Sequence, residues 1–227
     1  MKLIRNYLYN AGYQMLALII PFITAPYISR TLKPHGVGIY ADTNAWIQWF
    51  VLLASVGIAL YGNREIAYVR DDKEKLSRTF WEIQVVKMIM TVISYIVLCF
   101  FLNVYTQYKN YMWIQSLNIL AVAFDISWFY MGIEDFKRTV IRNTLVKLMS
   151  LALILLFVKS PNDIGVYIFL TTLSVTLGNF TLWPRLRILL VRVGLNTLRP
   201  LKHLKTSLAL FVPQIATQVY LILGRLQ

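Results

Sequence analysis

The sequence predicts an all-α fold, a polytopic transmembrane helix bundle of about seven spans. Hydrophobic residues make up 58% of the 227-residue chain and charged residues only 15%, against roughly 25% charged residues in an average soluble domain. The mean hydropathy is +0.58, and the apolar residues gather in runs near the ~20 residues that a helix needs to cross a bilayer. A water-soluble fold could not hide this much apolar surface.

Seven apolar runs are long enough to span. They are Tyr7–Ile28, Val37–Leu60, Trp81–Leu102, Tyr111–Ile133, Thr139–Val158, Ile164–Trp183 and Thr206–Leu223. The fifth is weaker because Arg142 and Lys147 lie in its first half, so the lysine either faces protein or water or reaches back to the interface. The first run is longer than the ~7–15-residue core of a signal peptide and is expected to be a retained helix, kinked by Pro21 and Pro26.

The distribution of basic residues predicts the orientation. With the N-terminus in the cytoplasm, 17 of the 23 lysines and arginines fall in cytoplasmic segments, five fall outside, and Lys87 lies within a span. This is the bias of a multi-pass membrane protein. The net charge of +13 therefore indicates topology and contact with anionic membrane lipids, and a soluble nucleic-acid binder is excluded. The single cysteine, Cys99, excludes an internal disulfide framework.

Polar residues recur at helical spacing on five of the runs. The sets are Asn44, Gln48 and Ser55; Gln84, Lys87, Thr91 and Ser94; Gln115, Asn118 and Asp125; Thr171, Ser174, Gly178 and Thr181; and Ser207, Gln214 and Gln218. Each set lies on one side of a helix. Such residues either hold helices together through hydrogen bonds or face a shared, wet cavity, and their number favours the cavity.

Two charges lie deep in adjacent runs. Lys87 is ~9 Å from the start of its helix, and Asp125 is ~12 Å from the cytoplasmic end of the next. Because an unpaired charge there costs at least ~2.5 kcal/mol, we expect the two to pair with each other, or Lys147 to act as the partner. A structural ion pair and a functional anion site are both consistent with this. Asp42, near the outer end of the second run, is either a proton or cation site or an interfacial residue beside Arg30.

The sequence shows no catalytic constellation. It contains no nucleophile–base set, no glycine-rich phosphate loop and no cluster of metal-ligating residues, so we expect no enzyme activity, no cofactor and no metal. His203 lies in a basic loop without metal-ligand partners, and Asp71 and Asp72 lie in a solvated charged run.

Three ordered blocks resemble a known family. They are residues 21–30 (PFITAPYISR) followed by 36–40 (GVGIY), residues 57–67 (GIALYGNREIA) and residues 125–136 (DISWFYMGIEDF). Across essentially the whole chain, the sequence is similar to bacterial oligosaccharide flippases, the Wzx-type polysaccharide biosynthesis proteins of the multidrug/oligosaccharidyl-lipid/polysaccharide exporter superfamily.

The resemblance implies a function. Members of this family have two related helix bundles around a central cavity, and they move undecaprenyl-diphosphate-linked oligosaccharide repeat units across the membrane for capsule, exopolysaccharide or O-antigen biosynthesis. Lipid-linked oligosaccharide is then the expected substrate, and a second lobe or polysaccharide assembly proteins are expected partners. The candidate diphosphate contacts are Arg30, Lys87 and Lys147, the candidate sugar contacts are Gln48, Gln84, Asn118 and Gln214, and the candidate ion-coupling or ion-pair residues are Asp42 and Asp125.

Two departures from the family pattern stand out. Leu32 is followed by Lys33 and Pro34 where the family usually has glycine, which should reshape an outer loop. The chain also looks like an N-terminal half, with residues 1–205 forming a six-helix transmembrane lobe and residues 206–227 the first helix of an incomplete second lobe. Since alternating access needs two halves, a nonfunctional truncated remnant is an open alternative. A multidrug antiporter of the same fold is another, and a membrane-bound polysaccharide polymerase or glycosyltransferase is disfavoured because no paired catalytic acids are visible.

Overall fold

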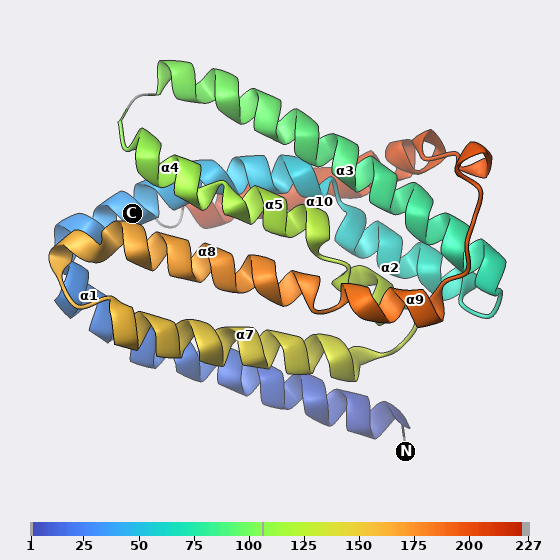
Figure 1. Cartoon of the computed structure of the whole chain (residues 1–227), viewed down its shortest axis with the longest axis horizontal. Coiled ribbons are helices and arrows are strands. Elements are labelled where there is room, and N and C mark those ends of the chain that lie inside the picture. Colours follow the sequence, from blue (N-terminus) through green and yellow to red (C-terminus); the bar gives the residue numbers. More distant parts are fainter. Residues whose placement is uncertain (1, 106, 224–227) are drawn as a thin grey trace.

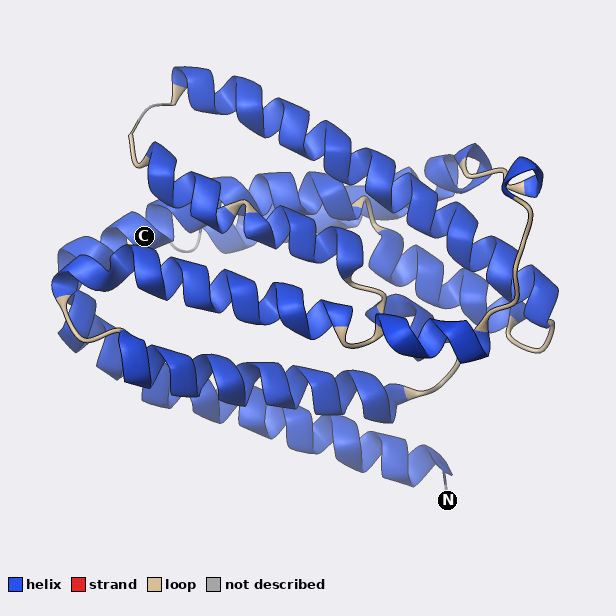
Figure 2. Ribbon diagram, viewed as in Figure 1, coloured by secondary structure: helices blue, strands red, loops and turns tan. Residues whose placement is uncertain are grey.

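The computed structural model describes the backbone of residues 2–105 and 107–223, and over these residues every regular element is a helix (Figure 2). The side chains of residues 2–14, 16, 17, 195, 212–214 and 216–223 lie outside the described set. The predicted all-α helix bundle is confirmed.

The first helix, α1 (Lys2–Ser55), crosses the bundle twice. In Figure 1 it runs from the N-terminus to the opposite end of the molecule and then turns back. The turn is at Lys33, whose backbone dihedral angles, φ 60° and ψ 171°, are the only non-helical pair within α1. Pro34 follows, and a proline disfavours the helical conformation of the residue before it. The dihedral angles at Pro21 and Pro26 remain helical, so the main bend lies beyond the first predicted span.

The rest of the chain folds into helices that run back and forth (Figure 1). They are α2 (Ile58–Val69), α3 (Lys73–Val104), α4 (Lys109–Gln115), α5 (Leu117–Phe124), α6 (Ser127–Gly132), α7 (Phe136–Phe157), α8 (Ile164–Phe180), α9 (Leu186–Leu189) and α10 (Leu201–Leu223), with short 3-10 turns at Pro161–Asp163, Trp183–Arg185 and Leu195–Thr197.

The connections alternate between the two ends of the bundle. We call the end that holds residues 70–72, 134–135 and 190–200 the basic end, and the end that holds Lys33, residues 105, 107 and 108 and residues 158–160 the distal end (Figure 1). The distribution of basic residues predicts that the first group of segments lies on one side of the membrane and the second group on the other. Two crossings of the bundle separate each connection of the first group from the next one of that group. The fold therefore places these arginine- and lysine-rich connections at the same end.

The described helices are long and apolar enough for a multi-pass membrane protein. By length and hydropathy, five stretches qualify: Leu18–Val69, Lys73–Val104, Lys109–Gly132, Phe136–Phe157 and Pro161–Leu189. The first has 52 residues and contains the turn at Lys33, so these five stretches overlap the first six predicted spans, the first of them only from Leu18 onward. The seventh predicted span lies in α10, most of whose side chains are outside the described set. The division into residues 1–205 and 206–227 stays a prediction.

Two spans are interrupted where the sequence predicts continuous helices. The second breaks at Val56 and Gly57, and α2 then continues to Val69 through residues expected to be loop. The fourth divides into α4, α5 and α6, with breaks at Ser116 and at Asp125. Neither interruption contains proline, the strongest sequence signal for a helix break.

Glycines allow very close packing between α2 and α6. A Cβ atom on Gly62 of α2 would lie 2.5 Å from the Trp128 ring. A Cβ atom on Gly132, the last residue of α6, would lie 2.5 Å from the side chain of Ile66. Trp128 and Ile66 are both buried. The two short helices therefore contact each other with no room for a methyl group at either glycine.

The helix break at Gly57 receives α10. Gly57 has a φ of 69°, a conformation that glycine adopts readily, and a Cβ atom there would lie 2.7 Å from the carbonyl oxygen of Ser207. The Ser207 hydroxyl donates to the carbonyl of Val56. The first turns of α10 are thus fixed against the junction of α1 and α2.

We predict that Lys33→Gly stabilises the protein. The φ and ψ of Lys33 fall in a region that is essentially reserved for glycine and costs other residues on the order of 1–3 kcal/mol. After allowance for the greater freedom of glycine in the unfolded chain, the gain should be about 1 kcal/mol, seen as a higher midpoint of thermal unfolding in detergent. Lys33→Ala, which removes the charge but keeps the Cβ atom, is the control. Equal midpoints for the two variants would contradict the strain argument.

Candidate functional site

The break at Asp125 is the centre of the candidate site. Helix α5 ends at Phe124, and the backbone of Asp125 is extended (φ −74°, ψ 106°) before α6 begins at Ser127. A helix end leaves its last carbonyl groups without helical partners. Inside a membrane each such group costs several kcal/mol unless another group of the protein satisfies it.

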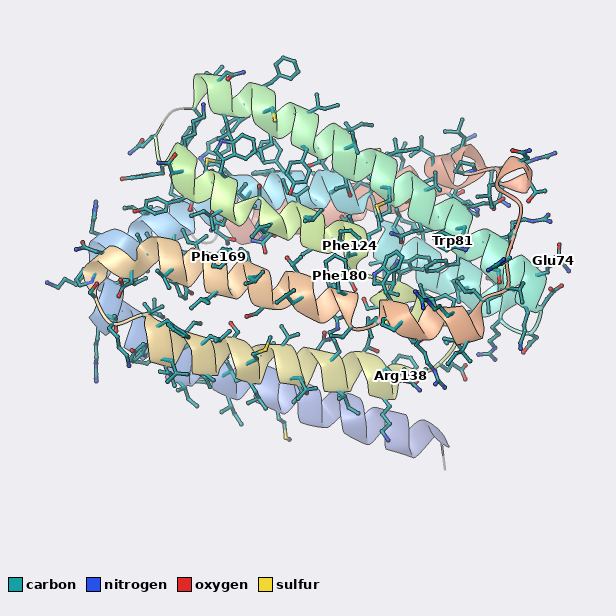
Figure 3. All side chains as sticks on the ribbon, in the orientation of Figure 1. Glu74, Trp81, Phe124, Arg138, Phe169 and Phe180 are labelled. Atoms are coloured by element: carbon teal, nitrogen blue, oxygen red, sulfur yellow. The ribbon has the colours of Figure 1, made fainter. Side chains whose placement is uncertain are left out.

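Side chains from α3, α8 and the turn after α8 satisfy these carbonyl groups. The bonds are Asn179 Nδ2 to the Ala121 carbonyl at 2.6 Å, Gln84 Nε2 to the Ala123 carbonyl at 2.7 Å, Trp183 Nε1 to the Phe124 carbonyl at 2.8 Å, and Lys87 Nζ to the carbonyl of Asp125 itself. The rings of Phe124 and Phe180 contact each other beside this break at a tilt of 34°, with centroids 4.2 Å apart (Figure 3). Four donors therefore hold the broken end of α5 in place.

The Asp125 carboxylate has a different partner from the one expected. Its Oδ1 atom accepts from the backbone N–H of Ser127 at 3.0 Å, at the start of α6, and lies 3.5 Å from Nη2 of Arg142 on α7. Arg142 also donates to the side-chain oxygen of Asn179. Lys87 reaches Asp125 as predicted, but it contacts the main-chain carbonyl. Arg142, treated from sequence only as a weakness in the fifth span, supplies the ion pair.

Burial differs within this cluster. Lys87 and Gln84 are 4% and 1% exposed, so both are enclosed by the bundle. Each donates a hydrogen bond to a carbonyl group at the α5 break. The Asp125 side chain is 37% exposed and that of Arg142 11%. The carboxylate is therefore the most exposed group of the cluster, whereas Lys87 is enclosed and bonds to the main-chain carbonyl of the same residue.

Residues of the polar stripes outside this cluster bond mainly within the bundle. Gln48 donates to Asn44 on its own helix at 3.3 Å, and the Ser94 hydroxyl donates to the Phe50 carbonyl at 2.7 Å. Asn118 and Lys147 are half-buried. The side chain of Gln214 lies outside the described residues. The first contact lies within one helix and the second joins two helices, and the roles of Gln48, Asn118, Lys147 and Gln214 in substrate binding stay predictions.

The distal end holds the other candidate charges. Asp42 accepts a 2.6 Å hydrogen bond from the hydroxyl of Tyr105. Burial and the adjacent Asp42 carboxylate raise the pKa of Tyr105 to about 12, so the phenol keeps its proton and remains a donor. Arg30 is exposed near the same end. The structure thus gives Asp42 an aromatic hydroxyl just beyond the end of α3 as its hydrogen-bond partner, and the roles of Asp42 and Arg30 stay predictions.

A buried network at the basic end was not predicted. The carboxylate of Glu82, 1% exposed on α3, accepts from the backbone N–H of Arg199 at 2.9 Å, from Lys202 Nζ at 2.6 Å and from His203 Nε2 at 2.8 Å. The other ring nitrogen of His203 lies 2.6 Å from the Tyr61 hydroxyl on α2.

This network joins the start of α10 to α2 and α3. Burial lowers the pKa of His203, which favours the neutral ring, with Nε2–H donating to Glu82 and Nδ1 accepting from Tyr61. His203, expected to be a loop residue without partners, is 3% exposed. Over the described residues no group of three or more His, Cys, Asp or Glu side chains could hold a metal ion, so the network is a hydrogen-bonded one.

We predict energetic coupling between Arg142 and Asp125. Arg142→Gln should lower the free energy of unfolding by about 2 kcal/mol, less than the ~3–5 kcal/mol of a fully buried pair because the Asp125 side chain is 37% exposed. Asp125→Asn in the same molecule should recover part of this loss, giving a coupling energy of about 1 kcal/mol in a double-mutant cycle of unfolding midpoints. Strictly additive losses would show that the two side chains do not interact.

Comparison with known proteins places the chain in a family. The profile of the family described as "Polysaccharide biosynthesis protein" matches residues 3–226. Two curated relatives, each provisionally named an O-antigen transporter, are similar: one from Escherichia coli (strain K12), 27% identical over 169 residues, and one from Shigella dysenteriae, 29% identical over 153 residues.

These alignments cover a larger share of this chain than of the two relatives. They take in 73% and 66% of this chain but 41% and 38% of the relatives, so the matched region spans about two fifths of the length of those proteins. No solved structure gives a significant match. Since the family profile covers nearly every residue, the chain belongs to the polysaccharide biosynthesis protein family.

Proposed function

We propose that the chain takes part in flipping undecaprenyl-diphosphate-linked oligosaccharide repeat units across the bacterial inner membrane, for capsule, exopolysaccharide or O-antigen biosynthesis. The names of the relatives favour transport over catalysis. The observation that carries the proposal is the broken transmembrane helix at Asp125, which holds a lysine, an arginine and an aspartate in one cluster.

Charges inside a membrane are rare and usually mark a transport pathway. Discontinuous helices are likewise the elements from which secondary transporters build their substrate and ion sites. Lys87 and Arg142 provide positive charge for a diphosphate, and the partly exposed Asp125 carboxylate provides a site where a coupling cation can bind or a proton can be exchanged. In this proposal the positive charge of Lys87 and Arg142 attracts the diphosphate towards the cluster, and polar side chains such as Gln48 and Asn118 contact the sugars.

The transport pathway in this proposal needs a second lobe. Alternating access works by the movement of two halves about a site between them, and the matched region spans about two fifths of the relatives. The described helices then correspond to one of the two moving halves, with α10 leading into the other. The Glu82–His203 network is where that helix is attached.

The flipping proposal is tested with a chimaera in which this chain replaces the matching region of the E. coli relative. In a strain that lacks the relative, the chimaera should restore the O-antigen ladder seen on gels of surface lipopolysaccharide. Lys87→Ala should abolish the ladder at unchanged protein level, because the positive charge and the bond to the α5 break are both lost. Lys205→Ala, which removes an exposed lysine, is the control and should leave the ladder intact. A normal ladder with Lys87→Ala would remove Lys87 from the pathway.

The proposed orientation has a separate test. In a Cys99→Ser background, which removes the single cysteine, a cysteine introduced at Lys109 at the distal end should react with a membrane-impermeant maleimide in spheroplasts. One introduced at Lys73 at the basic end should react only after the membrane is opened, because the excess of basic residues there favours the cytoplasm. The reverse pattern would overturn the assignment of the N-terminus to the cytoplasm.

A further inference from the structure

A groove between α7 and α8 opens at the basic end of the bundle. Its volume is about 660 Å³. Along α7 it is lined by Ile141, Leu145 and Met149, which recur every four residues, and on α8 by Leu177. These four side chains are 43%, 60%, 42% and 49% exposed. An exposed apolar stripe of this kind, in a groove between two membrane-spanning helices, has the shape to receive one hydrocarbon chain.

The same groove ends in positive charge. Arg138, where α7 begins, and Arg185, in the turn before α9, both line it, and Figure 3 shows Arg138 at the end of α7 that lies near α9. Arg138 forms an ion pair with Asp135, whereas Arg185 has no carboxylate partner among the described residues. Arg142, paired with Asp125, also lines the groove. Three guanidinium groups against two carboxylates leave this end of the groove positive.

The polar hydroxyl groups of the groove are already used as donors. The Tyr130 hydroxyl donates to the carbonyl of Leu182, and the Thr181 hydroxyl donates to the carbonyl of Gly178, both at 2.7 Å. The remaining lining between the arginines and the stripe is apolar. The groove therefore offers charge to a phosphate group but few hydrogen-bonding groups to a sugar, which favours a small anionic headgroup over a glycosylated one.

We propose that the α7–α8 groove is a binding site for one anionic phospholipid, such as phosphatidylglycerol. The phosphate lies between Arg138 and Arg185, which can each donate two hydrogen bonds to phosphate oxygens. One acyl chain follows Ile141, Leu145 and Met149, over the ~16 Å that separate Arg138 from Met149 along the helix. Basic pockets between transmembrane helices near the cytoplasmic surface are typical sites for such headgroups. This site does not depend on the proposed flipping activity.

The test measures which lipids stay with the purified chain. The chain is equilibrated in mixed micelles that contain equal amounts of phosphatidylglycerol and phosphatidylcholine with identical acyl chains, passed through a gel-filtration column, and analysed for bound lipid by mass spectrometry. Wild type should retain phosphatidylglycerol in preference to phosphatidylcholine. The double variant R138Q/R185Q should lose this preference, with affinity for phosphatidylglycerol lowered by on the order of tenfold.

Two further variants separate the site from general charge effects. R187Q/R192Q removes two exposed arginines of the same end that do not line the groove, and it should keep the preference. Leu145→Trp fills the apolar part with all arginines present, and it should lower retention of both lipids. Excess inorganic phosphate should not displace the bound lipid, because the acyl chain contributes to binding.

Three results would overturn the proposal. They are equal retention of the two lipids by wild type, an unchanged preference in R138Q/R185Q, and an equal loss in R187Q/R192Q, which would assign the preference to the charge of the whole basic end. Displacement by phosphate alone would show an anion site without a lipid tail. Circular dichroism and a single symmetrical gel-filtration peak establish that each variant is folded, and the flipping assay reports on the proposed function independently.

Discussion

A transmembrane helix that stops inside a membrane must have its carbonyl groups hydrogen-bonded by other parts of the protein, and the packing around Asp125 follows from this requirement. Gln84 and Lys87 come from α3, and Asn179 comes from α8. Each crosses to the α5 end and so joins its own helix to the break. The ion pair between Asp125 and Arg142 adds α7. The charge cluster and the helix packing are therefore a single structure, and removing one donor exposes a polar group that lipid cannot satisfy.

Hydropathy and charge pattern were sufficient to predict the helix bundle and to group its connections. Lys87 and Asp125 were placed at similar depth, which is correct, but residue counting cannot distinguish a carboxylate from a carbonyl group as the acceptor. That distinction depends on the helix break, and residues 124–127 (Phe-Asp-Ile-Ser) contain neither proline nor glycine. An aspartate can accept from the backbone N–H two residues further on, as Asp125 does from Ser127, and this turn-forming tendency was the one available signal. Arg142 was overlooked because an arginine in a span was treated as a cost.

The attachment of α10 lay beyond sequence reasoning for a different reason. Glu82 and His203 are 121 residues apart in the chain, and nothing in either local sequence indicates the other. Basic loop residues near a membrane normally face lipid headgroups or water, and most arginines of this loop are exposed. His203 differs because it is buried against the Glu82 carboxylate on α3, and the same carboxylate accepts from Lys202, which stays exposed.

The tight contact between α2 and α6 links these two regions mechanically. Tyr61, which meets His203, immediately precedes Gly62, and Gly62 lies against Trp128, three residues beyond Asp125. Neither Gly62 nor Gly132 leaves room for a methyl group between the two short helices. The packed pair connects the junction that anchors α10 to the charged break, because Tyr61 contacts His203 at one end and Trp128 follows Asp125 closely in the chain at the other. A displacement of α10 would therefore be passed towards Asp125 through directly packed side chains.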